Sequence, residues 1–232
     1  MWLTADCNQF RDAADYTRVV LSDRDDHVPV QHPAQSQHRP DGRSTRRDRN
    51  RVAVVDAYLD LINDGHPRPS VADVAARSGV SHRSVFRYFA DREELTRTSI
   101  ERQVGRVVSL LDTTVPPEAS LDERIELVLR RRFDLFEAVA PIARLVRTLA
   151  SEQELIRAEL TNNRLLYRTQ VQRMFTTELG RMDSERSART LAILDVLCSF
   201  ETYELLLDDQ GLSRAEGMAA LRSALSMLFS DS

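Results

Sequence analysis

Residues 70–95 have the sequence SVADVAARSGVSHRSVFRYFADREEL, and this stretch decides the fold. Ser70 and Ser81 each precede a short apolar-periodic segment, where a serine side chain accepts a backbone N–H and starts a helix. Gly79 lies between the two segments, and glycine readily adopts the left-handed backbone of a sharp turn. The small Ala75 lets the two helices pack closely. The spacing is therefore that of a helix-turn-helix.

A further helix precedes this motif. From Arg47 onward, apolar residues recur at steps of three and four positions, which is the pattern of one buried helix face. They are Val52, Val55, Tyr58, Leu59 and Ile62. Gly65 and Pro67 then end the helix.

Helical periodicity also dominates the chain after the motif. We expect helices at residues 95–111, 121–141, 151–179, 184–207 and 213–229. Pro141 ends the second of these, and the last two form a hairpin around Gln210 and Gly211. No strand-like alternation of useful length occurs, and the chain has only 7 glycines and 8 prolines among 232 residues. These features predict an all-α fold.

Charge is distributed unevenly along the chain. The net charge is −4, and because there is no lysine, all 32 basic residues are arginine. Residues 43–92 hold ten arginines against six acidic residues, a charge of +4, so the other residues sum to −8. Positive charge therefore collects around the motif, as DNA binding requires.

The N-terminal stretch and the cysteines limit the remaining possibilities. Residues 1–43 contain three prolines and only brief apolar clusters, which predicts a flexible extension. The two cysteines, Cys7 and Cys198, offer neither a disulfide framework nor a metal site. No stretch approaches the roughly 18 uninterrupted apolar residues of a membrane span, and a signal peptide is not evident. We expect a cytoplasmic protein without metal or cofactor.

The motif resembles the DNA-binding domain of the tetracycline-repressor (TetR) family. That family couples its helix-turn-helix to two aromatic residues, a basic residue and an acid-rich helix start, which here are Phe86, Phe89, Arg92 and Glu93-Glu94-Leu95. The resemblance covers about residues 52–95. It implies a homodimeric transcriptional regulator, in particular a repressor that a small-molecule ligand releases from its operator. The implied domains are a three-helix DNA-binding domain at residues 44–92 and a helical regulatory and dimerisation domain at residues 93–232.

The resemblance implies that residues 82–88 lie in the major groove of a double-stranded, inverted-repeat operator. The candidate DNA contacts are Ser70, Ser81, His82, Arg83, Ser84, Phe86, Arg87, Tyr88 and Arg92. Arg83 and Arg87 carry donors that pair with guanine edges, and Ser84 and Arg92 are expected at phosphates. Phe86 stands where the family usually has tyrosine, so the phosphate hydrogen bond of that hydroxyl cannot form.

Each of these residues also has a simpler competing role. Phe86 and Phe89 are expected to pack inward beside Val85, and in that case they contact no DNA. For His82, Arg83 and Arg87, the competing role is that of a solvated surface side chain.

The implied ligand site lies among the helices of residues 93–232. Its candidates are Phe133, Phe136, Arg144, Arg147, Tyr167, Met174 and Tyr203. The aromatic and methionine side chains fit an apolar pocket, but each of them also fits a plain core position. Arg144, Arg147 and Arg168 would hold an anionic ligand if they point inward, because a buried arginine demands a partner.

The C-terminal hairpin carries more apolar surface than one core face requires. The candidate dimer residues are Leu191, Leu194, Cys198, Leu205, Met218, Leu221, Leu225 and Leu228. Two such hairpins would pack as a four-helix bundle between two copies of the chain. The alternative is that these residues form only an intramolecular core.

Two other classes of function compete with a ligand-controlled regulator. An all-helical enzyme is disfavoured, because the sequence has no G-x-S-x-G elbow, P-loop or H-E-x-x-H motif. A constitutive architectural DNA-binding protein would need no effector, would lack an internal pocket and would bind DNA with little sequence preference.

Overall fold

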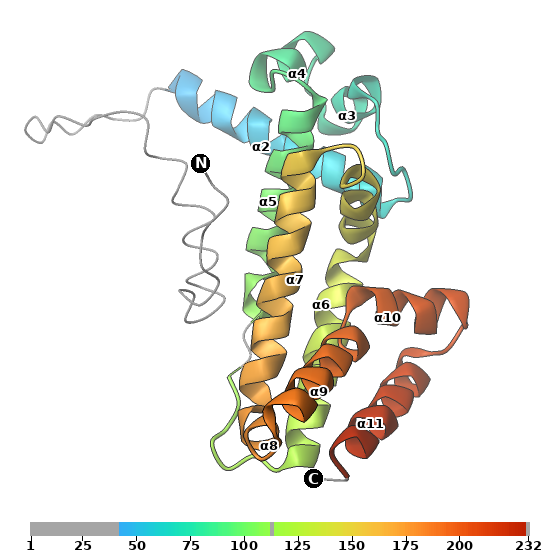
Figure 1. Ribbon diagram of the computed structural model, residues 1–232. Coiled ribbons are helices and arrows are strands. Elements are labelled where there is room, and N and C mark those ends of the chain that lie inside the picture. The colour runs from blue at the N-terminus through green and yellow to red at the C-terminus, as the bar shows by residue number, and fades with distance from the viewer. Residues whose placement is uncertain (1–41, 112–113, 231–232) are drawn as a thin grey trace, which may run out of the picture. The chain divides into compact units, whose positions relative to one another are not determined.

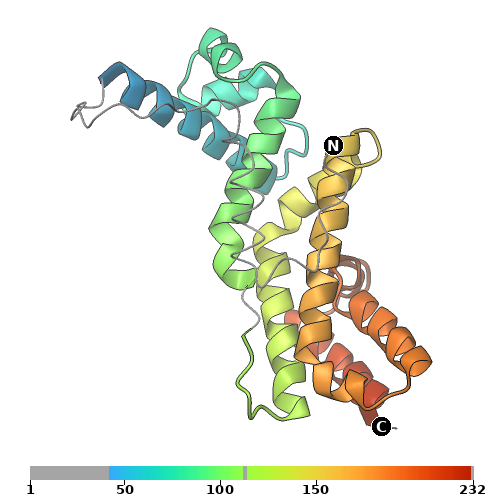
Figure 2. The ribbon, with the colours of Figure 1, turned by 60° about the vertical axis from the view of Figure 1, so that its left-hand side comes forward.

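The computed structural model describes residues 42–111 and 114–230, and this part of the chain is all-α, without a strand (Figures 1 and 2). Contacts divide it into two units. We call them the N-terminal unit, with residues 42–106 and 141–149, and the C-terminal unit, with residues 107–111, 114–140 and 150–230. Of the extension predicted for residues 1–43, residues 1–41 lie outside the described part. None of the described helices is long and apolar enough to cross a membrane.

Helix α2 (Gly42–Asn63) supplies the core face of the N-terminal unit. It starts at Gly42, before the position that periodicity indicated. Val55, Tyr58 and Leu59 are buried as predicted, and so is Val54. Val52 was expected on the same face, but it is 42% exposed. The buried side chains provide the apolar surface on which the next two helices pack.

The helix-turn-helix is formed by α3 (Val71–Ser78) and α4 (His82–Tyr88), which both contact α2. The Ser70 hydroxyl accepts a hydrogen bond from the Asp73 N–H at 3.2 Å, and the Asp73 carboxylate accepts one from the Ser70 N–H at 2.9 Å. This reciprocal pair is a capping box. Gly79 has φ +68°, which a side chain at that position would disfavour. The predicted motif is therefore confirmed, turn residue included.

Helix α5 (Arg92–Val107) leads into the short helix η2 (Val108–Leu111). The Asp91 carboxylate caps α5 by accepting the Glu94 N–H at 2.7 Å. Among the contacts that hold α5 to α2 are a buried hydrogen bond of 3.0 Å between the Tyr58 and Thr96 hydroxyls and the ion pair of Arg102 with Asp56. The N-terminal unit includes residues 93–106, which the resemblance placed in the regulatory and dimerisation domain.

The C-terminal unit is built from more helices than the periodicity suggested. They are α6 (Leu121–Leu149, of which residues 141–149 belong to the N-terminal unit), α7 (Glu154–Met174), α8 (Thr176–Gly180), α9 (Ser184–Leu197), α10 (Phe200–Glu204), the π-helical turn η3 (Leu205–Asp209) and α11 (Arg214–Ser230). Both views show α6 and α7 side by side (Figures 1 and 2). The largest fully buried side chains of this unit include Phe133, Phe136, Phe175, Leu194 and Leu225.

Three predicted helix boundaries are wrong. Pro141 lies inside α6 and does not end it, because a proline removes one hydrogen bond whereas the buried Ile142 continues the apolar face. The helix predicted for residues 151–179 breaks at Phe175. The helix predicted for residues 184–207 breaks after Leu197, where the Ser199 hydroxyl caps α10 by accepting the Thr202 N–H at 3.1 Å.

Candidate nucleic-acid interface

Helix α4 has one buried and one exposed face. Val85 and Tyr88 point into the N-terminal unit and are 2% and 7% exposed. His82, Arg83, Phe86 and Arg87 are exposed, and they all lie on the opposite face of the helix. The exposed face thus carries two guanidinium groups and an imidazole, which are donors suited to base edges and phosphates.

Phe86 and Tyr88 were both candidate DNA contacts, and the structure buries only Tyr88. Phe86 was expected to pack inward, but it is 54% exposed and contacts the His82 ring edge-on, with ring centres 5.0 Å apart. Tyr88 was expected to contact DNA, but its side chain is buried. The reason is the helix period, because residues three positions apart share a face and Val85 already anchors the buried one. Phe89, at the C-cap, is buried as predicted.

Tyr88 positions Arg87. The Tyr88 hydroxyl accepts hydrogen bonds from Asn50 Nδ2 on α2 and from Arg87 Nη2, both at 3.3 Å. These bonds, the one from Asn50 foremost, lower the pKa of Tyr88 from its ordinary value. The Arg87 guanidinium also lies 5.3 Å from the centre of the Tyr88 ring. These contacts hold Arg87 at the edge of the exposed face and restrict its side-chain conformations.

The serines of the motif are engaged in capping. The Ser70 hydroxyl donates to the Asp73 carboxylate at 2.6 Å, and this bond lowers the pKa of Asp73. Ser81 accepts the Ser84 N–H at 3.3 Å, and its hydroxyl lies 3.0 Å from the Ser84 hydroxyl. Ser70 and Ser81 are exposed, so both remain candidates for phosphate contact, while Ser84 is half-buried.

Arg92 is exposed at the first residue of α5, and within the described part of the chain it forms no ion pair. Its neighbour Glu94 is occupied, because it accepts the Ala90 N–H at 2.7 Å and lies 3.6 Å from Arg51. Arg51 in turn stacks on the ring of Phe89, 4.9 Å from its centre. Arg92 is therefore available to a phosphate, as the sequence indicated.

Sequence reasoning missed the basic start of α2. Arg46, Arg47 and Arg49 are exposed, and only Asp48 opposes them within the first three turns of the helix. The hydrogen bond between Asn50 and Tyr88 brings this end of α2 next to α4. The excess of arginine in residues 43–92 was the signal that could have found these three residues.

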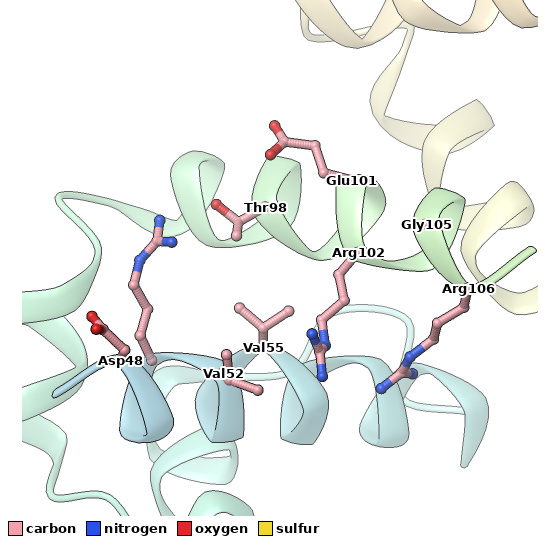
Figure 3. A pocket seen from close by; sticks show the side chains of 9 residues that line it. Asp48, Val52, Val55, Thr98, Glu101, Arg102, Gly105 and Arg106 are labelled. Atoms are coloured by element: carbon pink, nitrogen blue, oxygen red, sulfur yellow. The ribbon is translucent and has the colours of Figure 1, made fainter. Parts of the chain in front are cut away.

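A surface hollow of about 680 Å³ lies between α2 and α5 (Figure 3). It is lined by Asp48, Arg51, Val52, Val55, Thr98, Glu101, Arg102, Gly105 and Arg106. Figure 3 shows Arg102 and Arg106 reaching from α5 toward α2, where both pair with Asp56. These two arginines are therefore committed to holding the helices together, and no residue predicted for the ligand site lines the hollow.

The predicted ligand residues are only partly brought together. Phe136 lies at the centre of a cluster, with its ring centre 6.0 Å from Tyr167 and 5.7 Å from Tyr203, and Phe133 contacts Tyr203 at 5.3 Å. Met174, on α7, is also buried. The arginine candidates do not join this cluster. They are Arg144, which is exposed, Arg147, which donates to the Ala143 carbonyl at 3.2 Å, and Arg168, which pairs with Asp195 at 3.2 Å.

The predicted dimer residues fall into two groups. Leu191, Leu194, Cys198, Leu221 and Leu225 are buried within the protomer, where they support its own core. Leu205 is 47% exposed, while Met218 and Leu228 are half-buried. Burial also raises the pKa of the Cys198 thiol to about 11, so this thiol is unreactive at neutral pH. Ile193, Val196 and Met227 were not predicted, but they are among the most exposed large apolar residues.

Comparison with protein families agrees with the motif. Residues 61–97 match the family model of bacterial regulatory proteins of the tetR family. The repressor LfrR of Mycolicibacterium smegmatis is 28% identical over 96 residues, 41% of this chain and 50% of that protein. The fatty acid metabolism regulator protein of Bacillus subtilis is 22% identical over 85 residues, 36% of this chain and 44% of that protein. The chain thus spans about half the length of these relatives.

Solved structures support the fold of both units. A transcriptional regulator from Rhodococcus sp. Rha1 superposes with a TM-score of 0.55 at 16% identity, over 78% of this chain and 95% of that chain. A protein from Streptomyces coelicolor A3(2) superposes with a TM-score of 0.54 at 21% identity, over 78% of this chain and 99% of that chain. At these identities, the likeness concerns the fold.

Proposed function

We propose that this chain, whose residues 61–97 match the family model of bacterial regulatory proteins of the tetR family, is a member of that family and a sequence-specific DNA-binding transcriptional regulator. It acts as a repressor, as LfrR does by name, and a small-molecule effector releases it from its operator. Its site of action is the cytoplasm. The family and the named relatives are regulators rather than enzymes.

The exposed face of α4 is the observation that carries this proposal. His82, Arg83 and Arg87 project from a helix whose other face is anchored, and Tyr88 fixes the position of Arg87. A rigid helix with convergent donors is what readout of the major groove needs. Arg92 and the exposed arginines at the start of α2 supply phosphate contacts on either side, which set the register of the helix on DNA.

The regulator works as a homodimer. The apolar residues that remain exposed on the last helices support this: Ile193 and Val196 on α9, Leu205 on η3 and Met227 on α11. A twofold dimer would present two α4 helices to successive major grooves, about 34–36 Å apart. The effector site lies in the C-terminal unit, where aromatic side chains cluster around Phe136.

Selection from a pool of random DNA duplexes tests the proposal directly. We expect the full chain to enrich an inverted repeat whose half-sites are one helical turn apart, or a multiple of it. The enriched site should bind on the order of a thousandfold more tightly than a scrambled duplex at physiological salt. Enrichment of asymmetric sites, or equal affinity for all duplexes, would contradict the proposal and favour an architectural DNA-binding protein.

A further inference from the structure

Arg132 on α6 is an arginine in the core of the C-terminal unit. It is 4% exposed. Its Nη1 donates to the Gln170 side-chain oxygen at 2.9 Å, and its Nη2 donates to the Tyr167 carbonyl at 3.0 Å. The guanidinium lies 4.6 Å from the centre of the Tyr167 ring. Its Nε is buried and has no acceptor. One N–H of a buried cation is therefore left for a further partner.

The charge of Arg132 is not neutralised by its neighbours. Gln170 and the Tyr167 carbonyl are neutral, and the nearby Cys198 thiol, with its pKa raised to about 11, stays protonated. Asp195 is the acidic group that acts on Arg132 electrostatically, but its carboxylate pairs with Arg168 at 3.2 Å. No carboxylate of the described residues forms an ion pair with Arg132. Burial accordingly lowers the pKa of this guanidinium.

Another arginine of the same helix, Arg124, also has a buried Nε without an acceptor, but its charge is paired with a carboxylate. Arg124 has a side chain that is 14% exposed, and it forms an ion pair with Glu178 on α8, whose side chain is 7% exposed. Arg132 is buried more deeply and has no such partner. A buried unpaired charge is costly, and an anion would relieve that cost.

The surroundings of Arg132 suit the apolar body of a ligand. Phe136 lies one turn further along α6, and its ring centre is 5.5 Å from Phe200 and 5.7 Å from Tyr203. Phe200 and Tyr203 belong to α10, a five-residue helix between the end of α9 and the π-helical turn η3. Such interruptions of an α-helix are frequent at functional sites, and a short segment can shift without breaking long helices.

We propose that the C-terminal unit binds an organic anion, with the acidic group on Arg132 and the apolar body against Phe136, Phe200 and Tyr203. Because these rings contact one another, the ligand enters when α10 and η3 move aside. The inference rests on the proposed function in one respect only, namely that this anion is the effector. The proposed ligand class is an aromatic or branched carboxylate or sulfonate. The residue that binds its acidic group, Arg132, was not among the candidates predicted from the sequence.

Two fluorescent probes with the same aromatic body test the proposal on the full chain without DNA. The sulfonate probe is 8-anilinonaphthalene-1-sulfonate, and the neutral probe is N-phenyl-1-naphthylamine. In Arg132→Met we expect the Kd of the sulfonate probe to rise about tenfold, the usual loss for one charge-assisted hydrogen bond, while that of the neutral probe changes less than about twofold. Arg130→Met is the matched control, because Arg130 is exposed on the same helix and its loss changes the net charge equally. It should leave both affinities unchanged.

The thermal unfolding midpoint separates a binding role from a structural one. If the role of Arg132 is to bind an anion, Arg132→Met should unfold at the wild-type temperature or above, because the substitution removes an unpaired charge. If Arg132 serves only to hold α6 to α7 through its hydrogen bonds to Gln170 and Tyr167, the variant should unfold at a lower temperature. The affinities for both probes should then fall equally. That result would overturn the proposal, as would an unchanged preference for the sulfonate probe in Arg132→Met.

The wild-type protein provides a test that depends on no variant. 1-Naphthoate should raise the unfolding midpoint, whereas 1-naphthamide, its neutral counterpart, should not. Equal increases in the unfolding midpoint with the two compounds would contradict the proposal that the ligand is an anion. Release of operator DNA by naphthoate is measured separately. If naphthoate binds through Arg132 but leaves DNA binding unchanged, the anion site stands and the proposed effector control fails. If sequence-specific DNA binding itself is absent, the probe result is unaffected.

Discussion

Arg87 and Arg92 are both exposed arginines of the N-terminal unit, but their surroundings predict different effects of mutation on DNA binding. Arg87 is held by the Tyr88 hydroxyl at 3.3 Å on the exposed face of α4. We expect Arg87→Ala to cost on the order of 1–3 kcal/mol on the selected operator and to relax preference at one symmetric pair of base positions. If Arg83 also contacts a base, Arg83→Ala should cause a similar loss of operator affinity and of base preference. Nonspecific affinity should fall much less.

Arg92 begins α5, and we propose that its guanidinium contacts a phosphate rather than a base. Arg92→Ala should weaken binding to every duplex about equally and lower the slope of log K against log salt by roughly one unit. Salt titrations of the three variants on the operator and on a scrambled duplex give both quantities. An identical phenotype for Arg92→Ala and both α4 variants would refute this division of roles.

The roles of single residues were predicted well where backbone conformation determines the residue type. They were predicted poorly where the role depends on which side chains are buried. Ser70, Gly79 and Ser81 occupy the predicted caps and turn, since few residue types fit those positions. Tyr88 is buried although a DNA contact was predicted for it, and Phe86 is exposed although inward packing was its competing role. Both residues are aromatic, and the phase of a seven-residue helix is hard to fix from its sequence. Arg132 was missed because it follows Arg130 and Arg131, and three consecutive arginines suggest a solvated face.

At the scale of the element, the start of α2 is a basic arm beside α4, the helix that we propose reads DNA. Arg46, Arg47 and Arg49 are exposed there, and Asn50 ties this end of α2 to Tyr88. We expect replacement of all three arginines by alanine to weaken binding to any DNA and to lower the salt slope by up to about three units, roughly one per lost phosphate contact. The preferred sequence should not change, because phosphates carry no sequence information.

The control for the basic arm removes three exposed arginines of the C-terminal unit instead, at Arg130, Arg181 and Arg189. The change in net charge is the same, so any effect of overall charge appears in both proteins. If the two triple variants show the same salt slope, the arm makes no direct contact with DNA. Selection from random duplexes with the arm variant checks that the recognised sequence is retained.

Helix existence was predictable, whereas helix breaks were not. Apolar periodicity located each long helix of the described residues, because burial of one face drives amphipathic helices to form. It predicted one helix where α9, α10 and η3 follow one another, since the apolar pattern continues across Ser199. The break depends on the Ser199 cap and on the packing of Phe200, which only tertiary contacts decide.

At the scale of the whole molecule, apolar surface has two uses that the sequence could not separate. Leucine content alone predicted one dimer interface, but Leu194 and Leu225 are fully buried in the protomer. Charged residues at those two positions would disrupt the core and so would not test association. The exposed residues Val196 and Met227 are instead available for contact with a second chain.

Oligomeric state is therefore best tested with Val196→Glu combined with Met227→Glu. These side chains are 63% and 67% exposed on α9 and α11, two helices that contact one another, so the substitutions leave the protomer core intact. Placing carboxylates at an apolar contact between two chains should convert a dimer to a monomer, because each would be buried without a partner. Light scattering should give half the mass, with an unchanged circular dichroism spectrum and an unfolding midpoint that no longer depends on protein concentration.

The matched control carries Asn162→Glu and Gln172→Glu, which add the same charge at exposed positions of α7 and should leave the dimer unchanged. The monomeric variant also links association to DNA recognition. A single α4 helix reads one half-site, and a monomer lacks the second, tethered α4 helix. The affinity of the monomeric variant for the inverted repeat should therefore fall to about its affinity for an isolated half-site. A dimer mass for Val196→Glu with Met227→Glu would place the interface elsewhere on the chain. A monomer that still distinguishes the full inverted repeat from a half-site would show that recognition does not require this dimer.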